Sequence, residues 1–290
     1  MNGQYKDNLY LTDFYNEVLS VDHFQQEHPT YQVIKTWKKQ FPNLTAGITT
    51  RHGGTSSHPY ESLNLAFHVN DNPQDVINNR KILANQLGFS LDHWILGEQV
   101  HGANVETVKS DSAYVGAGST PDIPAIANVD GIITNKRNVL LCAFFADCVP
   151  LYFYDPSSGW IGIAHAGWKG TVSGIAKEMV KRLNQEGVLS NRIHVAIGPS
   201  IGPQHYQVNH LVIEQIPQQY IEHVCVKLDH VEDQYLLDLK KLNYLMLIDQ
   251  AIKPEQITIS QQCTFEQDYF YSHRRDQGKT GRMLGFIGLS

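Results

Sequence analysis

Two residues that could bind a metal, or act as nucleophile and base, stand at the ends of expected strands. Cys148 lies in the segment FADCVP directly after an apolar run, and His165 lies in AHAGWKG at the end of another. About one hairpin of chain separates the two residues, so their side chains can converge. A thiol and an imidazole together suit either a metal site or a thiol nucleophile with an imidazole base.

A third candidate ligand, His101, lies in the segment EQVHG. The glycine after it lets the backbone turn and lets a ligand approach closely. Catalytic zinc sites use three nitrogen or sulfur ligands and keep a fourth position open. His101, Cys148 and His165 match that count, so we predict one divalent metal ion, zinc, at these residues. A metal-free Cys148–His165 pair fits the same residue types, and both interpretations stay open here.

Two basic segments could bind an anion. Arg51 precedes the Gly53-Gly54 turn, and a guanidinium can hold a phosphate through two hydrogen bonds. The segment SHRRDQGKTGRM near the C-terminus concentrates basic residues in an otherwise acidic chain. Both segments fit a phosphate or nucleotide-like substrate, and a solvated surface stretch is the alternative interpretation of each.

Composition limits the class of protein. The chain has 290 residues, of which 42% are apolar and 18% charged, which allows a sizeable core and argues against extensive disorder. Its net charge of -6 gives no global attraction to nucleic acid or anionic lipid. The four cysteines form no CxxC pair, and neither a secretion signal nor a membrane-length apolar run is evident. We therefore expect a cytoplasmic protein with reduced thiols.

Hydrophobic patterning predicts a mixed α/β fold. The expected strands are residues 47–50, 131–134, 139–145, 151–154, 160–164, 194–197 and 257–260. The expected helices are residues 73–87, 172–184 with Thr171 as N-cap, 210–216 and 239–250. We predict a single layered domain over residues 36–290, with mixed β-sheets flanked by helices, after an N-terminal extension over residues 1–35. No GxGxxG or P-loop motif supports nucleotide binding through those loops.

The motifs taken together resemble the laccase-domain (YfiH/YlmD-type) purine nucleoside phosphorylase family, formerly called multicopper polyphenol oxidases. The resemblance is carried by TTRHGG, SLNL, Asn79-Arg80, EQVHG, FADCVP, AHAGWKG, AIGPSIGP, Cys263-Thr264 and SHRRDQGKTGRM. These segments occur in the family's order over roughly residues 40 to 288, and they are closest to the YlmD-type bacterial members. The chain departs from the family at Lys169, where arginine is usual, and at His205, where cysteine is common.

This resemblance implies a fold similar to a group of cysteine hydrolases and a metal site on His101, Cys148 and His165. It implies phosphorolysis of adenosine, inosine, guanosine or methylthioadenosine, together with adenosine deaminase activity. A metal-bound water would attack C6 in deamination, whereas inorganic phosphate would attack C1′ in phosphorolysis. The matching motif positions add Asp147, Gln99 and Asn64 as catalytic candidates, and Arg51, Arg274 and Arg275 as substrate or phosphate contacts.

Three other functions are alternatives to a purine nucleoside phosphorylase. A copper polyphenol oxidase would need many imidazoles in HxH pairs, and none of the 14 histidines forms such a pair, although copper stays possible at the single site. The second alternative is a metal-free Cys/His hydrolase. The third is a non-enzymatic, metal-bound accessory protein of the cell envelope. The expected partners are a purine nucleoside and inorganic phosphate, without nucleic acid or membrane, in a monomer or homodimer.

Overall fold

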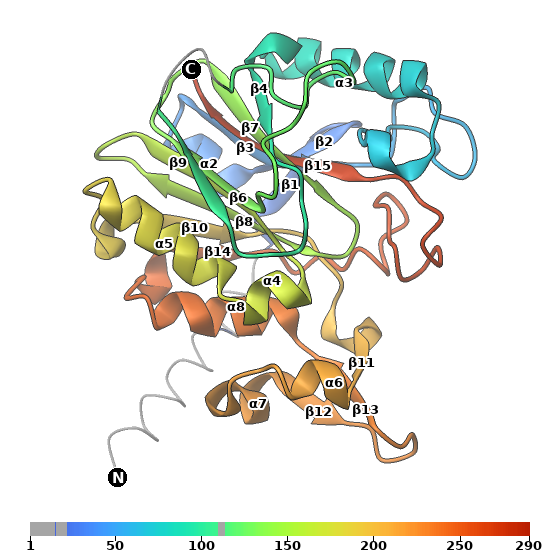
Figure 1. The fold of residues 1–290 in the computed structure, drawn as a ribbon, viewed down its shortest axis with the longest axis vertical. Coiled ribbons are helices and arrows are strands. Elements are labelled where there is room, and N and C mark those ends of the chain that lie inside the picture. Colours follow the sequence, from blue (N-terminus) through green and yellow to red (C-terminus); the bar gives the residue numbers. More distant parts are fainter. Residues whose placement is uncertain (1–14, 16–21, 110–113) are drawn as a thin grey trace.

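Two six-stranded sheets stacked face to face form the framework of the protein (Figure 1). The computed structural model describes Tyr15 and residues 22–109 and 114–290. In the first sheet the strand order is β1 (Phe24–His28), β2 (Tyr31–Ile34), β3 (Leu44–Thr49), β15 (Met283–Leu289), β7 (Val139–Phe145) and β4 (Trp94–Leu96). Only β4 runs parallel to its neighbour, so this sheet is mixed.

The second sheet contains the hairpin that carries two candidate ligands. Its strand order is β14 (Ile257–Ile259), β10 (His194–Ile197), β8 (Val149–Asp155), β9 (Trp160–Ala166), β6 (Gly131–Thr134) and β5 (Val105–Val108). The outer pairs β10–β14 and β5–β6 are parallel, and the inner pairs are antiparallel. A small third sheet consists of β11 (Gln207–Asn209), β13 (Gln234–Leu237) and β12 (Cys225–Lys227).

Strand β7 shows why the sequences of the central strands are unbroken runs of apolar residues. Leu141 and Phe145 point into the core between the two sheets, whereas Leu140 and Cys142 point to the opposite face. Successive side chains of a strand alternate between faces, so a strand covered on both sides needs apolar residues at every position. The sequence of β7, VLLCAFF, meets this requirement.

Helices cover the outer faces and complete four layers. Helix α3 (Pro73–Leu87) lies over the first sheet, and α5 (Ile175–Gln185) and α8 (Leu239–Ile248) lie over the second (Figure 1). The N-terminus of α3 is capped by the Asn72 side chain, which accepts a hydrogen bond from the backbone N–H of Gln74. The shorter helices are α2 (Lys35–Gln40), α4 (Trp168–Val172), α6 (His210–Ile213) and α7 (Gln218–Val224).

The expected mixed α/β layers are confirmed, and several boundaries need correction. Strands 131–134, 139–145 and 194–197 and helix 73–87 are found with the predicted limits. The expected helix 172–184 is instead two helices, and Thr171 lies inside α4 rather than capping a helix. The break is at Gly174, whose φ of 87° is a left-handed conformation that interrupts a helix and that glycine tolerates.

The segment before residue 36 contributes to the first sheet where it is described. Strands β1 and β2 form a hairpin, and β2 pairs with β3. Tyr15 is buried beside α8, where its hydroxyl donates to Asp238. Residues 1–14 and 16–21 lie outside the described residues, so the division into an extension and a domain stays a prediction. None of the helices in the described part of the chain is long and apolar enough to cross a membrane.

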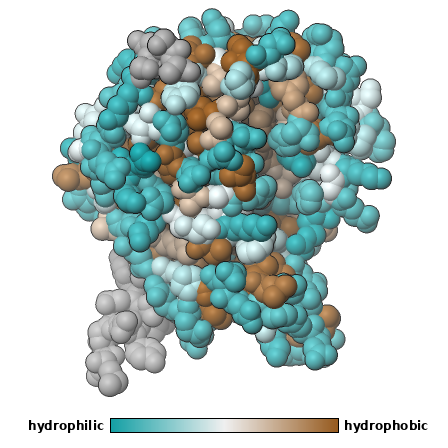
Figure 2. All heavy atoms as spheres, viewed as in Figure 1, coloured by the Kyte–Doolittle hydropathy of each residue, from teal (hydrophilic) through white to brown (hydrophobic). Residues whose placement is uncertain are grey.

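The two-sheet core predicts a strong contrast between two leucines. Leu141 is fully buried between the sheets, whereas Leu211 of α6 is 57% exposed. Helix α6, which carries Leu211, contacts strands β11 and β13 of the small sheet. Figure 2 shows hydrophobic side chains at the surface in its lower part, where this sheet lies. Leu141→Ala should lower the free energy of unfolding by about 2–5 kcal/mol, because it leaves a cavity between packed layers.

The matched control is Leu211→Ala, which should change that free energy by about 0.5 kcal/mol or less. Urea unfolding followed by tryptophan fluorescence measures both. Equal destabilisation by the two substitutions would contradict the layered core.

Candidate functional site

The β8–β9 hairpin brings Cys148 and His165 to the same place. Val149 pairs with Ala166 and Pro150 pairs with His165. Cys148 immediately precedes Val149, so strand alternation puts its side chain on the same face as that of Pro150. The thiol therefore lies on the face of His165, near the rim of the second sheet.

The loop after β4 carries His101 to the same rim. The Gln99 side chain ties this loop to β7, because its Nε2 donates to the Phe144 carbonyl at 2.9 Å and its Oε1 accepts from the Phe144 N–H at 2.7 Å. His101 itself has a φ of 61°, a left-handed conformation that needs support from its surroundings. This bend turns three successive backbone N–H groups towards one acceptor.

That acceptor is the buried carboxylate of Asp130. It accepts hydrogen bonds from the N–H groups of Val100 at 3.1 Å, His101 at 3.1 Å and Gly102 at 2.8 Å. It also accepts from Nδ1 of His165 at 2.9 Å, which leaves Nε2 of that ring for Cys148 or a metal ion. Asp130 was not predicted from the sequence, and its only signal is an acidic residue immediately before the apolar strand β6.

The three candidate ligands form one group. Their ligand atoms all lie within 4.8 Å of one another, and the rings of His101 and His165 meet edge-on with centroids 4.7 Å apart. A Cβ at Gly167 would lie 3.1 Å from the Cys148 sulfur and 3.1 Å from His101 Cδ2, so glycine leaves this space open. Two imidazoles, one thiol and room beside them fit a zinc-type ion.

The electrostatics also favour a ligand thiolate. Burial raises the pKa of Cys148, but the charge of His165 and hydrogen bonds with both histidines outweigh burial and hold that pKa below its usual value. Burial lowers the pKa of His165, but the thiolate and Asp130 outweigh burial and hold that pKa above its usual value. Thiolate is the form of cysteine that binds metals and attacks electrophiles, so the site is prepared for either chemistry.

A cavity of about 810 Å³ opens beside this group. Its lining includes His101, Cys148 and His165, together with aromatic and basic side chains: Phe67, Phe144, Trp168, Tyr206, His68, Arg80, His273, Arg274 and Arg282. The loop containing residues 118–125 closes part of one side. This volume and the mixture of apolar walls with a few polar groups are typical of a small-molecule site.

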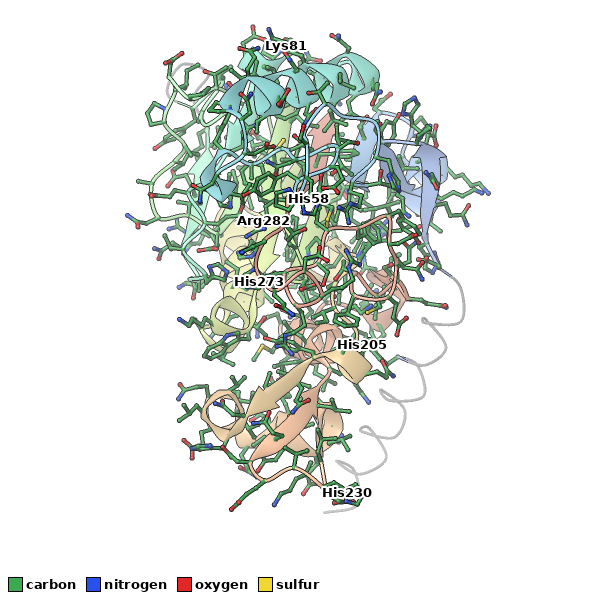
Figure 3. All side chains as sticks on the ribbon, turned by 90° about the vertical axis from the view of Figure 1, so that its right-hand side faces the viewer. His58, Lys81, His205, His230, His273 and Arg282 are labelled. Atoms are coloured by element: carbon green, nitrogen blue, oxygen red, sulfur yellow. The ribbon has the colours of Figure 1, made fainter. Side chains whose placement is uncertain are left out.

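Three guanidiniums at this cavity, those of Arg80, Arg274 and Arg282, lack a carboxylate partner among the described residues. Arg80 donates to the carbonyls of Leu65 and Gly118, and Arg282 donates to those of Thr280 and Gly281. Figure 3 shows Arg282 near His273, between helix α3 and the small sheet. Positive charge that carbonyl dipoles only partly balance attracts an anion.

His68 adds a neutral imidazole to this basic wall. Burial, followed by the charges of Arg282 and Arg80, lowers its pKa to about 4. Near neutral pH the ring is therefore uncharged and can both donate and accept a hydrogen bond. His68 and Arg80 were not predicted as site residues, although Arg80 belongs to a motif that carries the resemblance. Arg282 belongs to the basic segment predicted to bind an anion, in which only Arg274 and Arg275 were named as substrate or phosphate contacts.

Asp147, Gln99 and Arg274 line the cavity, each with hydrogen bonds to the protein. The carboxylate of Asp147 accepts from the Thr264 hydroxyl at 2.6 Å and from the backbone N–H of Arg274 at 2.7 Å. The guanidinium of Arg274 donates to the Gln207 carbonyl at 3.0 Å and lies over the Tyr206 ring. These contacts fix the cavity wall.

Arg51, Asn64 and Arg275 do not line the cavity, which differs from the expectation that they contact substrate. Arg51 donates to the Glu61 carbonyl and lies over the Tyr271 ring. Asn64 is fully buried, and its Oδ1 accepts from the backbone N–H of Arg282 at 3.0 Å. Arg275 donates to a group of backbone carbonyls, those of Thr264, Phe265, Gln267 and Phe270.

Comparison with known proteins agrees with this architecture. The family described as multi-copper polyphenol oxidoreductase laccase matches residues 45–290. The chain is 44% identical over 271 residues to purine nucleoside phosphorylase YlmD of Geobacillus stearothermophilus, a match that covers 92% of this chain and 97% of that protein. It is 42% identical, with the same coverage, to purine nucleoside phosphorylase YlmD of Bacillus subtilis.

Solved structures of the same family have the same fold as this chain. The hypothetical protein YfiH of Bacillus licheniformis aligns with a TM-score of 0.87 and 40% identity, over 93% of this chain and 100% of that chain. The structure of YlmD from Geobacillus stearothermophilus aligns with a TM-score of 0.85 and 42% identity, over 93% and 99% of the two chains. The predicted fold class is therefore confirmed.

The contacts of Asp130 predict a loss of metal affinity when its charge is removed. Asp130→Asn replaces one acceptor oxygen by an N–H donor that faces N–H groups, so both His165 and the His101 loop lose support. Zinc affinity, measured by competition with a chromogenic chelator, should fall about 10-fold to about 100-fold.

Asp155→Asn is the matched control. Asp155 is also fully buried, at the far end of β8, where it accepts from Ser157 and Ser158. This variant should lose stability without losing zinc affinity. An unchanged zinc affinity in Asp130→Asn would contradict the role given to Asp130.

Proposed function

Since the chain belongs to the laccase-like YfiH/YlmD family, we propose that it is a zinc-dependent purine nucleoside phosphorylase with adenosine deaminase activity. The observation that carries the proposal is one cavity lined both by a three-ligand metal group and by three guanidiniums that have no ion-pair partner in the described part of the chain. Relatives named purine nucleoside phosphorylase support the reaction class. Adenosine, inosine, guanosine and methylthioadenosine are the proposed substrates. We also propose a cytoplasmic location, because the four cysteines are free thiols and the cytoplasm keeps thiols reduced.

The donor set supports zinc over a multicopper centre. Two imidazoles and a thiolate with an open side match a catalytic zinc site, and one copper ion could use the same ligands. A four-copper oxidase needs many more imidazole ligands than the two in this group. When bound, zinc supplies a Lewis acid that can polarise a substrate oxygen or acidify water.

Phosphate is proposed to bind at the basic wall. The guanidiniums of Arg282 and Arg80 offset the charge of hydrogen phosphate, and the neutral imidazole of His68 donates or accepts a hydrogen bond. A phosphate oxygen would then form a bond to C1′ of the ribose while the bond from C1′ to the purine nitrogen breaks. The proton of hydrogen phosphate would end on the departing base, which balances the reaction.

The aromatic and polar walls are proposed to hold the nucleoside. Phe144, Trp168 and Tyr206 offer ring faces or edges for the purine. After their contacts within the protein, the Asp147 carboxylate can accept one more hydrogen bond, and the Gln99 amide can accept or donate one. Asn64 is proposed to act indirectly, by holding the backbone of Arg282.

A metal-free hydrolase that uses Cys148 as nucleophile is the second candidate. It is favoured by the pKa of Cys148, which the charge of His165 and hydrogen bonds with both histidines hold low in spite of burial. Thiol alkylation of metal-free protein separates the two functions. Activity that survives metal removal and disappears on alkylation would support the hydrolase.

The main prediction is that metal and activity disappear together. Zinc-loaded protein with adenosine and phosphate should produce ribose-1-phosphate and adenine, with inosine or hypoxanthine from deamination, as resolved by chromatography. His101→Ala, Cys148→Ala and His165→Ala should each lose the zinc ion held by these three residues, together with turnover, because a site with only three protein ligands depends on each of them. Absence of all these products from zinc-loaded protein would sink the proposal. A zinc content per chain equal to that of the wild type in all three variants would sink the assigned ligands.

The placement of the arginines predicts different effects on phosphate use. Arg282→Gln should raise the KM for phosphate about 10-fold to about 100-fold, since a charge-assisted hydrogen bond contributes about 1.5–3 kcal/mol. Arg51→Gln is the control, because Arg51 lies outside the cavity lining, and its KM for phosphate should stay within about two-fold. A larger effect from Arg51→Gln than from Arg282→Gln would place the phosphate at Arg51.

A further inference from the structure

A second group of metal-ligating side chains lies behind the cavity wall. It consists of His205, Cys263 and Glu266, whose ligand atoms all lie within 4.8 Å of one another. None of the three lines the cavity. Figure 3 shows His205 where the small sheet joins the rest of the molecule. The group therefore stands apart from His101, Cys148 and His165.

Backbone contacts hold the two segments of this group together without help from an ion. The N–H of Thr264 donates to the Ser200 carbonyl at 3.0 Å, and the N–H of Gly202 donates to the Cys263 sulfur at 3.1 Å. The thiol is buried and faces the turn that carries His205. Its position relative to this turn is thus set by the fold.

The imidazole of His205 is oriented from two sides. Its ring stacks on Phe265 with centroids 4.3 Å apart and planes 13° apart. Its Nε2 lies 2.9 Å from a carboxylate oxygen of Glu266. A cation can replace the proton shared by these two atoms, and Cys263 supplies a third donor on the same side.

Gly202 keeps the side of the thiol that faces its turn free of another side chain. A Cβ at this position would lie 3.2 Å from the Cys263 sulfur and 3.4 Å from Oε1 of Gln204. The amide oxygen of Gln204 lies near this same position, and this oxygen or a water molecule would serve as the fourth donor. Structural zinc sites are usually four-coordinate with thiolate, imidazole or carboxylate ligands.

We propose that His205, Cys263 and Glu266 bind a second zinc ion that fastens the loop before β11 to the loop after β14. The same loops hold the cavity wall, because the N–H of Ile201 and the hydroxyl of Thr264 both donate to Asp147. The guanidinium of Arg274 also reaches the His205 carbonyl at 3.4 Å. The ion would stiffen the wall next to Cys148 without touching substrate.

The number of zinc ions per chain tests this inference. Full-length protein loaded with zinc and dialysed against metal-free buffer should hold about two zinc ions, by elemental analysis. His205→Ala and Glu266→Gln should each lower this number to about one and leave His101, Cys148 and His165 loaded. Cys263→Ser should do the same, and it provides a near-isosteric check on folding.

His210→Ala is the matched control. His210 also pairs with a carboxylate, that of Asp233, but no thiol groups with that pair among the described residues. This variant should keep both ions. A stoichiometry of one in the wild type, or an unchanged stoichiometry in His205→Ala and Cys263→Ser, would overturn the second site.

A second readout separates this inference from the proposed function. In His101→Ala protein, added zinc should still raise the melting temperature and protect Cys263 from alkylation, as located by mass spectrometry. Both effects should vanish when His205→Ala is added. Reactive Cys263 in zinc-loaded His101→Ala protein would contradict the second site, whatever the outcome of the phosphorylase assay.

Discussion

The buried carboxylate of Asp130 is the contact on which the geometry of the candidate metal group depends. One side chain accepts hydrogen bonds from three consecutive N–H groups of the His101 loop and from Nδ1 of His165. Burying a carboxylate costs free energy unless it is hydrogen-bonded. The folded state is therefore favourable only when the His101 loop and the His165 ring are placed so that they donate to Asp130. The loop with its left-handed His101 and the orientation of the second imidazole are therefore fixed together.

The stacked sheets explain why this contact can form. Packing between the sheets and under α5 and α8 holds the β8–β9 hairpin and β6 rigid, and it places Asp130 at the start of β6 beside His165. The anion-attracting side chains come from elsewhere, Arg80 from α3 and Arg282 from the segment before β15. Cys148 and His165 thus come from the second sheet, whereas His101 and Arg282 come from segments next to strands of the first sheet, and all of them meet at the cavity.

Local pattern was enough to predict some elements and not others. The apolar run of β7 and the helix over residues 73–87 were predictable because burial on both faces and a capped helix leave strong signals. The convergence of Cys148 with His165 followed from their places at the ends of one hairpin. The part played by Asp130 was not predictable, since it depends on contacts between residues about 30 positions apart in the chain. From the sequence, Arg51 and Arg282 were equally plausible anion-binding residues of basic loops. Tertiary packing turns Arg51 towards Glu61 and places Arg282 at the cavity.

The central claim is that His101, Cys148 and His165 hold one zinc ion open to the cavity that receives phosphate and nucleoside. Anomalous diffraction at the zinc absorption edge, from crystals grown with zinc and soaked with inorganic phosphate, tests it most directly. We predict a zinc peak bonded to all three side chains, with phosphate in the same cavity near Arg282. A zinc-loaded crystal with no peak at these three residues would contradict it.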